Sequence, residues 1–171
     1  MDTIAFAPIG IIHSPFTVLT EMPVQPAGAK DVQGEVHLRE DLCAGLKDLD
    51  GFSHIMLLYH FHKNSGFSLS VTPFMDTVER GLFSTRAPRR PNAIGISVLR
   101  LTRIEGCVLH VLDVDVLDGT PLLDLKPYVP AFDNFDASRT GWMEHNVAKA
   151  ADLRSDGRFV EANDNGLPGR D

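Results

Sequence analysis

Apolar and polar positions alternate along most of this chain, which predicts a protein built mainly of β-strands. The clearest segment is 52–62, where Ile55, Leu57, Tyr59 and Phe61 form one wholly apolar face. Its other face is mixed and carries three histidines. The same pattern predicts further strands at 4–13, 35–38, 94–104, 108–117 and 122–125.

The segment 108–117 predicts a strand paired with 94–104 through a turn at Glu105-Gly106. In this strand Val108, Leu112, Val114 and Val116 are expected to point to one side. Asp113 and Asp115 would then point to the other side. Two such acids could act as an acid–base pair, but acids at alternate positions favour a solvent-facing surface.

Helical signals are few and short. One or two turns are expected at 41–47, where Leu42 and Leu46 are spaced i, i+4, and a short helix anchored by Trp142 is expected through Met143 to Ala151. The pattern predicts a mostly β fold, an antiparallel β-barrel or strongly curved sheet with one or two short helices. We expect a barrel domain at 1–135 and a partly disordered C-terminal extension at 136–171.

Composition narrows the class of protein. The 171 residues include 43% hydrophobic and 23% charged residues, with a formal net charge of -7. No apolar run approaches the roughly 20 residues of a membrane span, and the N-terminus lacks a signal-peptide pattern, so we expect a cytoplasmic protein without membrane contact. Cys43 and Cys107 lack metal-like spacing, and a disulfide scaffold is not implied. The acidic charge argues against non-specific coating of nucleic acid but allows a local basic patch.

Such a patch occurs at 81–95, where Arg86, Arg89 and Arg90 lie among Pro88 and Pro91. The prolines fix φ and bias the preceding residues away from helix, which predicts a stiff, extended loop. Guanidinium groups on such a loop suit an anionic or polar ligand. A solvated surface loop is the alternative.

Other constellations are weaker. His54, His60 and His62 share one face of a predicted strand. A metal site there would need a further ligand from a neighbouring strand, and no such residue is obvious. Half-buried, hydrogen-bonded histidines are therefore favoured, and no metal is expected. Asp118-Gly119-Thr120-Pro121 is a tight turn by composition. Glycine-rich nucleotide loops and the nucleophile elbow of hydrolases do not occur in the sequence.

Several segments together resemble one family, the TrmO/YaeB (TsaA-like) proteins. The resemblance covers about Ile4 to Ala131, and its most specific parts are Arg90–Gly95 and Asp118–Tyr128. The other matching segments are Ile9–Pro15, Gln25-Pro26 with Gly34-Glu35, Gly51–His54, Phe61-His62 and Phe83–Arg86.

The resemblance implies a homodimeric β-barrel methyltransferase that uses S-adenosyl-L-methionine. The family's activity is N6-methylation of threonylcarbamoyladenosine, the base just 3′ of a tRNA anticodon. The family's cofactor contacts fall on Pro26, Ala27, Gly28, His62, Lys63, Arg86, Leu101, Asp118, Gly119, Thr120 and Pro121. We expect Arg89, Arg90 and Asn92 to meet the tRNA, and no catalytic residue is assigned.

Two departures keep alternatives open. The family's Gln-Pro-Gly reads Gln-Pro-Ala-Gly at 25–28, and the chain lacks the longer C-terminal domain of many bacterial members. The alternatives are a methyltransferase of the same fold with another substrate, a non-catalytic module that binds S-adenosyl-L-methionine, and a histidine-ligated metal enzyme.

Overall fold

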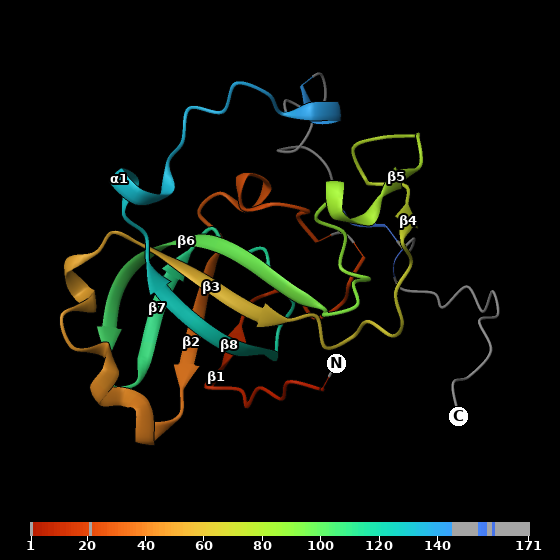
Figure 1. Ribbon diagram of the computed structural model, residues 1–171. Coiled ribbons are helices and arrows are strands. Elements are labelled where there is room, and N and C mark those ends of the chain that lie inside the picture. Colours follow the sequence, from red (N-terminus) through yellow and green to blue (C-terminus); the bar gives the residue numbers. More distant parts are fainter. Residues whose placement is uncertain (1, 21, 145–153, 157–158, 160–171) are drawn as a thin grey trace.

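Six antiparallel strands close into a barrel in the computed structural model, which describes residues 2–20, 22–144, 154–156 and 159 (Figure 1). The strands follow the order β1-β2-β7-β6-β3-β8 and close through the pairing of β8 with β1. The predicted fold is confirmed. The strand bounds are Gly10–His13 (β1), Gln33–Leu38 (β2), His54–His60 (β3), Ile94–Glu105 (β6), Val108–Leu112 (β7) and Thr120–Pro127 (β8).

Alternation along β3 fills the barrel as predicted. Ile55 and Leu57 are fully buried and Tyr59 nearly so, while the residues between them are partly exposed. The same core contains Ile12, Val36, Leu99, Leu109 and Leu122, one or more from every strand. Strand β1 is shorter than predicted, and Ile4 and Phe6 ahead of it are exposed.

The prediction for 108–117 is wrong in its phase. Strand β7 ends at Leu112, and Leu109 and Val111 are the residues that face the core. At Asp113 the backbone adopts φ 72°, a left-handed conformation that breaks the alternation. Val114 and Val116 are therefore buried after the break. Asp115 does not reach a solvent face, as the site below shows.

Short elements complete the fold. The helical turn predicted at 41–47 is a 3-10 helix, η2, at Glu40–Leu46. A small hairpin of β4 and β5 carries the arginine-rich loop beside the barrel (Figure 1). The remaining elements are η1 (Pro26–Ala29), η3 (Leu49–Gly51), β4 (Ser70–Val71), β5 (Arg80–Gly81), η4 (Leu82–Ser84), α1 (Pro130–Asp133) and η5 (Gly141–Met143).

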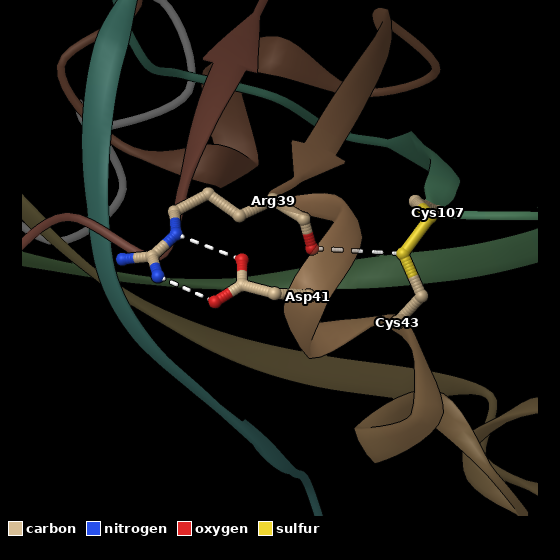
Figure 2. The surroundings of a disulfide bond; sticks show 4 residues. All are labelled: Arg39, Asp41, Cys43 and Cys107. Carbon is tan, nitrogen blue, oxygen red and sulfur yellow. Dashed lines mark hydrogen bonds and ion pairs between the residues drawn. A yellow bond between two sulfur atoms is a disulfide. The ribbon is translucent and has the colours of Figure 1, made fainter.

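The two cysteines form a disulfide, which corrects the expectation from their spacing. Cys43 in η2 and Cys107 in the turn between β6 and β7 lie 5.1 Å apart at their Cα atoms (Figure 2). An ion pair between Arg39 and Asp41 lies beside the bridge. The disulfide joins residues 64 positions apart, so it fastens η2 to the barrel.

Described parts of the C-terminal extension contact the segments that flank the barrel. Trp142 Nε1 donates a hydrogen bond to the Ser84 carbonyl at 2.9 Å, and Ser155 N donates to the Met22 carbonyl at 2.7 Å. Phe159 packs edge-on against Phe74. The disorder predicted for this extension falls outside the described residues, as does the predicted helix beyond Glu144; the described turn at Trp142 is the 3-10 helix η5. Among the described helices, none is both long and apolar enough to cross a membrane.

Candidate functional site

A cavity of about 490 Å³ lies between one end of the barrel and the arginine-rich loop. Strand pairing explains its position, because the last residues of β3 lie opposite the first residues of β6, with Tyr59 facing Gly95. The loop 85–90 and the segment 22–25 cover this end of the barrel, and residues from the extension add to the wall. The cavity thus joins segments from the whole length of the chain.

Gly95 permits this packing. A Cβ on Gly95 would lie 2.3 Å from the Tyr59 ring and 2.8 Å from Phe61, so no larger residue fits without movement. The two aromatic rings meet edge to face at 5.4 Å between centroids. The glycine therefore lets Tyr59 lie against the β6 backbone with its hydroxyl directed along the strand toward Ser97.

Tyr59, Ser97 and the partly buried Asp115 form a hydrogen-bonded series at the cavity. Ser97 Oγ donates to Asp115 Oδ1 at 2.7 Å, and Tyr59 Oη lies 3.0 Å from Ser97 Oγ. A serine hydroxyl has one hydrogen, so Tyr59 must be the donor to Ser97. The series ends on the carboxylate, and Asp115 itself lines the cavity.

Burial has the largest effect on the pKa values of Asp115 and Tyr59. It raises the pKa of Asp115 to about 6, against the lowering effects of the Ser97 hydrogen bond and the nearby Arg86 charge. Burial also raises the pKa of Tyr59, and the Asp115 charge adds to that rise. Asp115 is therefore ionised at neutral pH but more basic than an ordinary aspartate, while Tyr59 keeps its proton.

Polar groups on the covering segments complete the site. Arg86 Nη1 donates to Gln25 Oε1 at 3.1 Å, which ties the loop to segment 22–25. His62 Nδ1 lies 3.4 Å from Thr120 Oγ1. Burial, followed by the charges of Lys63 and His60, lowers the pKa of His62, so the ring is neutral at pH 7. This side of the cavity has a fixed cation in Arg86 and a neutral imidazole in His62.

The structure brings four of the predicted cofactor residues to the cavity wall: His62, Lys63, Arg86 and Thr120. The other seven lie elsewhere. Pro26, Ala27 and Gly28 form η1 beside Gln25, and Leu101 lies farther along β6, where it packs against the core. Asp118, Gly119 and Pro121 flank Thr120 without lining the cavity. Their cofactor roles stay predictions.

Asp118, predicted to contact the cofactor, forms hydrogen bonds within the protein. Its Oδ1 accepts hydrogen bonds from His13 Nδ1 at 3.0 Å and from the Ser14 backbone N–H at 3.2 Å. These bonds fix the 118–121 turn to the end of β1. The turn in turn positions Thr120, whose hydroxyl donates to the Leu117 carbonyl at 2.7 Å.

The predicted tRNA residues lie around the same loop. Arg90 lines the cavity, donates to the Thr85 carbonyl at 3.0 Å, and places its guanidinium 5.6 Å from the Phe83 ring centre. Arg89 is half-buried near Gly66, and Asn92 is exposed. Arg90 thus helps to brace the loop from within, and the tRNA contacts stay predictions.

His54 and His60 of β3 and His62 just after it do not gather at one place. His54 Nδ1 lies 2.9 Å from Ser53 Oγ, His60 is exposed, and only His62 lines the cavity. In the part of the chain that the structure describes, no group of three or more His, Cys, Asp or Glu residues is placed to hold a metal ion.

The sequence favoured a solvent-facing position for Asp115, which is wrong, and did not single out Ser97. The signal available in the sequence was a hydroxyl within the apolar run 94–99. In the structure Ser97 is only 3% exposed, so its hydroxyl needs a hydrogen-bond partner. The partner of Ser97 is Asp115, whose side chain turns inward because of the left-handed backbone at Asp113.

Comparison with known proteins connects this chain to one family. The family model for the tRNA-methyltransferase O N-terminal domain matches residues 11–134. A probable S-adenosyl-L-methionine-binding protein of Pyrococcus abyssi is 52% identical over 162 residues, and the match covers 95% of this chain and 88% of that protein. The tRNA (adenine(37)-N6)-methyltransferase of Escherichia coli is 34% identical, with coverage of 76% and 60%.

The fold is also shared. The crystal structure of TrmO from Pseudomonas aeruginosa superposes with a TM-score of 0.69 at 38% identity, covering 82% of this chain and 63% of that one. The match to the mouse tRNA (adenine(37)-N6)-methyltransferase covers only 31% of the mouse protein. The chain thus matches nearly all of the archaeal relative and a smaller share of the others.

Proposed function

The chain belongs to the tRNA-methyltransferase O family, and from that membership we propose that it transfers a methyl group from S-adenosyl-L-methionine to N6 of an adenine in tRNA. The proposal is supported by the matches to named tRNA methyltransferases over the barrel. One observation carries it at the level of the site: the cavity combines a fixed cation with a partly buried carboxylate at the mouth of the barrel.

The residues of the cavity fit the cofactor. S-adenosyl-L-methionine supplies a methyl group activated by a sulfonium, and its other parts are an adenosine and an amino acid. Arg86, held by Gln25, is suited to the methionine carboxylate because a guanidinium binds that group through two parallel hydrogen bonds. Apolar residues such as Ile94 and Leu117 cover much of the remaining wall and suit a flat base.

The protein's task in this reaction is mainly to align the reactants. The nitrogen attacks the methyl carbon from the side opposite sulfur, and correct alignment is worth roughly 7–11 kcal/mol of the barrier. Segments 22–25 and 85–90 form walls of the cavity that can hold the reactants in this alignment.

The specific substrate we propose is threonylcarbamoyladenosine beside the anticodon. Its N6 already carries a carbonyl substituent, which makes that nitrogen a weak nucleophile. Its threonyl carboxylate is an anion, and the arginine-rich loop beside the cavity offers Arg89 and Arg90 as partners.

The test measures cofactor binding and methyl transfer separately. Titration calorimetry should show micromolar binding of S-adenosyl-L-methionine, and Arg86→Ala should weaken it at least tenfold. Arg39→Ala is the matched control, because Arg39 is exposed and pairs with Asp41 beside the distant disulfide. Tritiated methyl groups should enter bulk tRNA from cells that lack this gene, and mass spectrometry of the nucleosides identifies the product.

The alternatives predict different results. Cofactor binding without transfer to tRNA indicates a binding module or another substrate, whereas no cofactor binding overturns the proposal. Methylated adenosine without the threonylcarbamoyl group overturns only the specific substrate.

We also propose a homodimer that works in the cytoplasm. The closed barrel removes one reason for expecting it, since no edge strand of the barrel is left to cover. The remaining support is apolar surface near the C-terminal side, where Phe132 and Phe135 are 71% and 80% exposed. Light scattering should give twice the chain mass of 18.8 kDa, and a monomer would contradict the proposal.

A further inference from the structure

We propose that Asp115 is the general base of this site and takes the proton from N6 of the adenine as that nitrogen accepts the methyl group. The inference rests on the proposed methyl transfer and assigns a residue to a step that has none. Asp115 is a partly buried carboxylate at the cavity wall, and Ser97 holds one of its oxygens.

Asp115 is the one acidic side chain among the described residues that line the cavity. Other titratable or cationic groups in the same wall are Tyr59, His62, Lys63, Arg86 and Arg90. Tyr59 retains its proton, and ammonium and guanidinium groups are hydrogen-bond donors without an acceptor atom. The bases that remain are Asp115 and the neutral His62.

One direct hydrogen bond holds the Asp115 carboxylate, and contacts of the neighbouring residues support it. Ser97 donates to Oδ1, and the Tyr59 hydroxyl fixes Ser97 in turn. Two residues earlier, Asp113 is clamped by Arg100 through both carboxylate oxygens and receives the Asp31 backbone N–H at 2.9 Å. The bond to Ser97 uses one oxygen of Asp115, and a carboxylate has a second oxygen with lone pairs of its own. A base with a fixed orientation is what proton transfer to a positioned substrate needs.

The reaction balances in charge and atoms with this base. The N6 lone pair forms the new bond to the methyl carbon, and the carbon–sulfur bond breaks with its electron pair going to sulfur. The N6 proton passes to a carboxylate oxygen of Asp115. A sulfonium cation and a carboxylate anion thus become a neutral thioether and a neutral carboxylic acid. A buried site favours this loss of both charges, because burial penalises charged groups.

The titration of Asp115 agrees with the assignment. Burial raises its pKa to about 6, which leaves it ionised at pH 7 and a stronger proton acceptor than an exposed aspartate. Arg86 opposes that rise. A carboxylate bound to Arg86 would offset the arginine's charge and make Asp115 more basic still.

The experiment compares four variants with the parent protein, one of them His62→Asn, which removes the other possible base. Asp115→Asn keeps the shape and a hydrogen-bond acceptor for Ser97 but cannot take the proton. Ser97→Ala removes the bond that lowers the Asp115 pKa. Asp41→Asn is the control, an exposed acid beside the disulfide. The measurements are the single-turnover rate of methyl transfer to bulk tRNA with saturating S-adenosyl-L-methionine at pH 5 to 9, and cofactor affinity by calorimetry.

We expect Asp115→Asn to lower the transfer rate about 10²- to 10⁴-fold, as for loss of a general base, with cofactor affinity within threefold of the parent. Ser97→Ala should move the acid limb of the rate profile to higher pH and retain most of the rate above it. Asp41→Asn should match the parent in both measurements.

Other outcomes overturn the assignment. A tenfold loss of cofactor affinity with an unchanged rate in Asp115→Asn makes the residue a cofactor ligand. An acid limb that stays in place in Ser97→Ala and disappears in His62→Asn makes His62 the base. If the parent binds the cofactor yet methylates no tRNA, the proposed function fails and this inference falls with it.

Discussion

The left-handed backbone at Asp113 decides which side chains reach the cavity. Aspartate tolerates this conformation better than most residues, and Arg100 holds it there with two hydrogen bonds. The break reverses the alternation of β7, so Asp115 turns toward Ser97 while Val114 and Val116 enter the core. A period-two pattern cannot reveal such a break, because Val108, Leu112, Val114 and Val116 are all apolar and fit an unbroken strand equally well.

Gly95→Ala should disrupt the site through packing. The added Cβ would overlap the Tyr59 ring at 2.3 Å, and that ring is anchored in the core. We expect a loss of about 1–3 kcal/mol in the free energy of unfolding, typical of overpacking. Gly45→Ala is the control, since nothing lies within 4 Å of its Cβ position. Denaturant unfolding of both variants checks this, and equal stability would contradict the close packing at Gly95.

The partly buried carboxylate should make stability depend on pH. The pKa of Asp115 is about 6 in the folded protein and about 3.9 for an unfolded aspartate. Because the folded value is the higher one, the contribution to stability is full below pH 4 and is lost as pH rises through 6. At pH 8 the charge costs about 3 kcal/mol at most.

Asp115→Asn removes this cost. Its unfolding free energy should exceed that of the parent at pH 8, and the difference should shrink steadily between pH 7 and pH 4. Urea unfolding across that range measures it. A constant difference at every pH would show that the Asp115 pKa is not raised by folding.

At the scale of elements, regular alternation of apolar and polar residues was sufficient to predict the long strands. The face of Ile55, Leu57 and Tyr59 predicted β3, and the predicted partner strand at 94–104 is β6. The strand predicted at 4–13 was too long, since β1 begins only at Gly10. The apolar side chains of Ile4 and Phe6 suggested a longer strand, but both are exposed and do not contribute to the core. Local patterns register apolar character, but burial depends on whether a partner strand lies opposite.

The disulfide shows a second limit of local reasoning. Cys43 and Cys107 meet only because η2 folds against the turn after β6, and no spacing in the sequence indicates that contact. For the candidate site, the sequence predicted the arginine-rich loop and the contribution of His62 and Thr120. It could not place Gln25 or Ser97, whose roles depend on contacts across 61 and 18 positions.

Removal of the disulfide should affect stability and leave the site intact. It closes a loop across 64 positions, and the chain-entropy account gives about 4 kcal/mol for such a loop. The site lies at the other end of β6, whose 12 residues span roughly 36 Å. Cys43→Ser/Cys107→Ser should therefore lower the melting temperature while S-adenosyl-L-methionine affinity remains within twofold. Tenfold weaker binding would show that the bridge shapes the cavity.

At the scale of the whole molecule, barrel closure concentrates binding at one end. The strands β1, β2, β3, β6, β7 and β8 leave a core filled with side chains, so a ligand has no space within it. The hairpin of β4 and β5, the loop 85–90 and the described parts of the extension gather at the same end (Figure 1). The arginine-rich loop is thus a local cationic feature on a chain of net charge -7.

This charge distribution gives a test of tRNA binding. A protein with so acidic a charge has little diffuse attraction for nucleic acid, so binding must depend on a few arginines. Arg89→Ala/Arg90→Ala should weaken tRNA binding and lower the slope of log affinity against log salt by roughly 0.7–0.9 for each phosphate that the variant no longer neutralises. Cofactor affinity should change little, because Arg86 remains. Filter binding of tRNA at a series of salt concentrations gives the slope.

The internal bonds of Arg90 make the controls important. Its Nη1 donates to the Thr85 carbonyl, so its replacement can loosen the loop as well as remove a charge. Arg90→Lys keeps the charge without the fork of donors; normal tRNA binding in this variant assigns the effect to charge. Arg39→Ala/Arg103→Ala removes two exposed, ion-paired arginines away from the cavity and should leave the slope unchanged. If both double variants flatten the slope equally, tRNA responds to total charge, and the loop is not its binding surface.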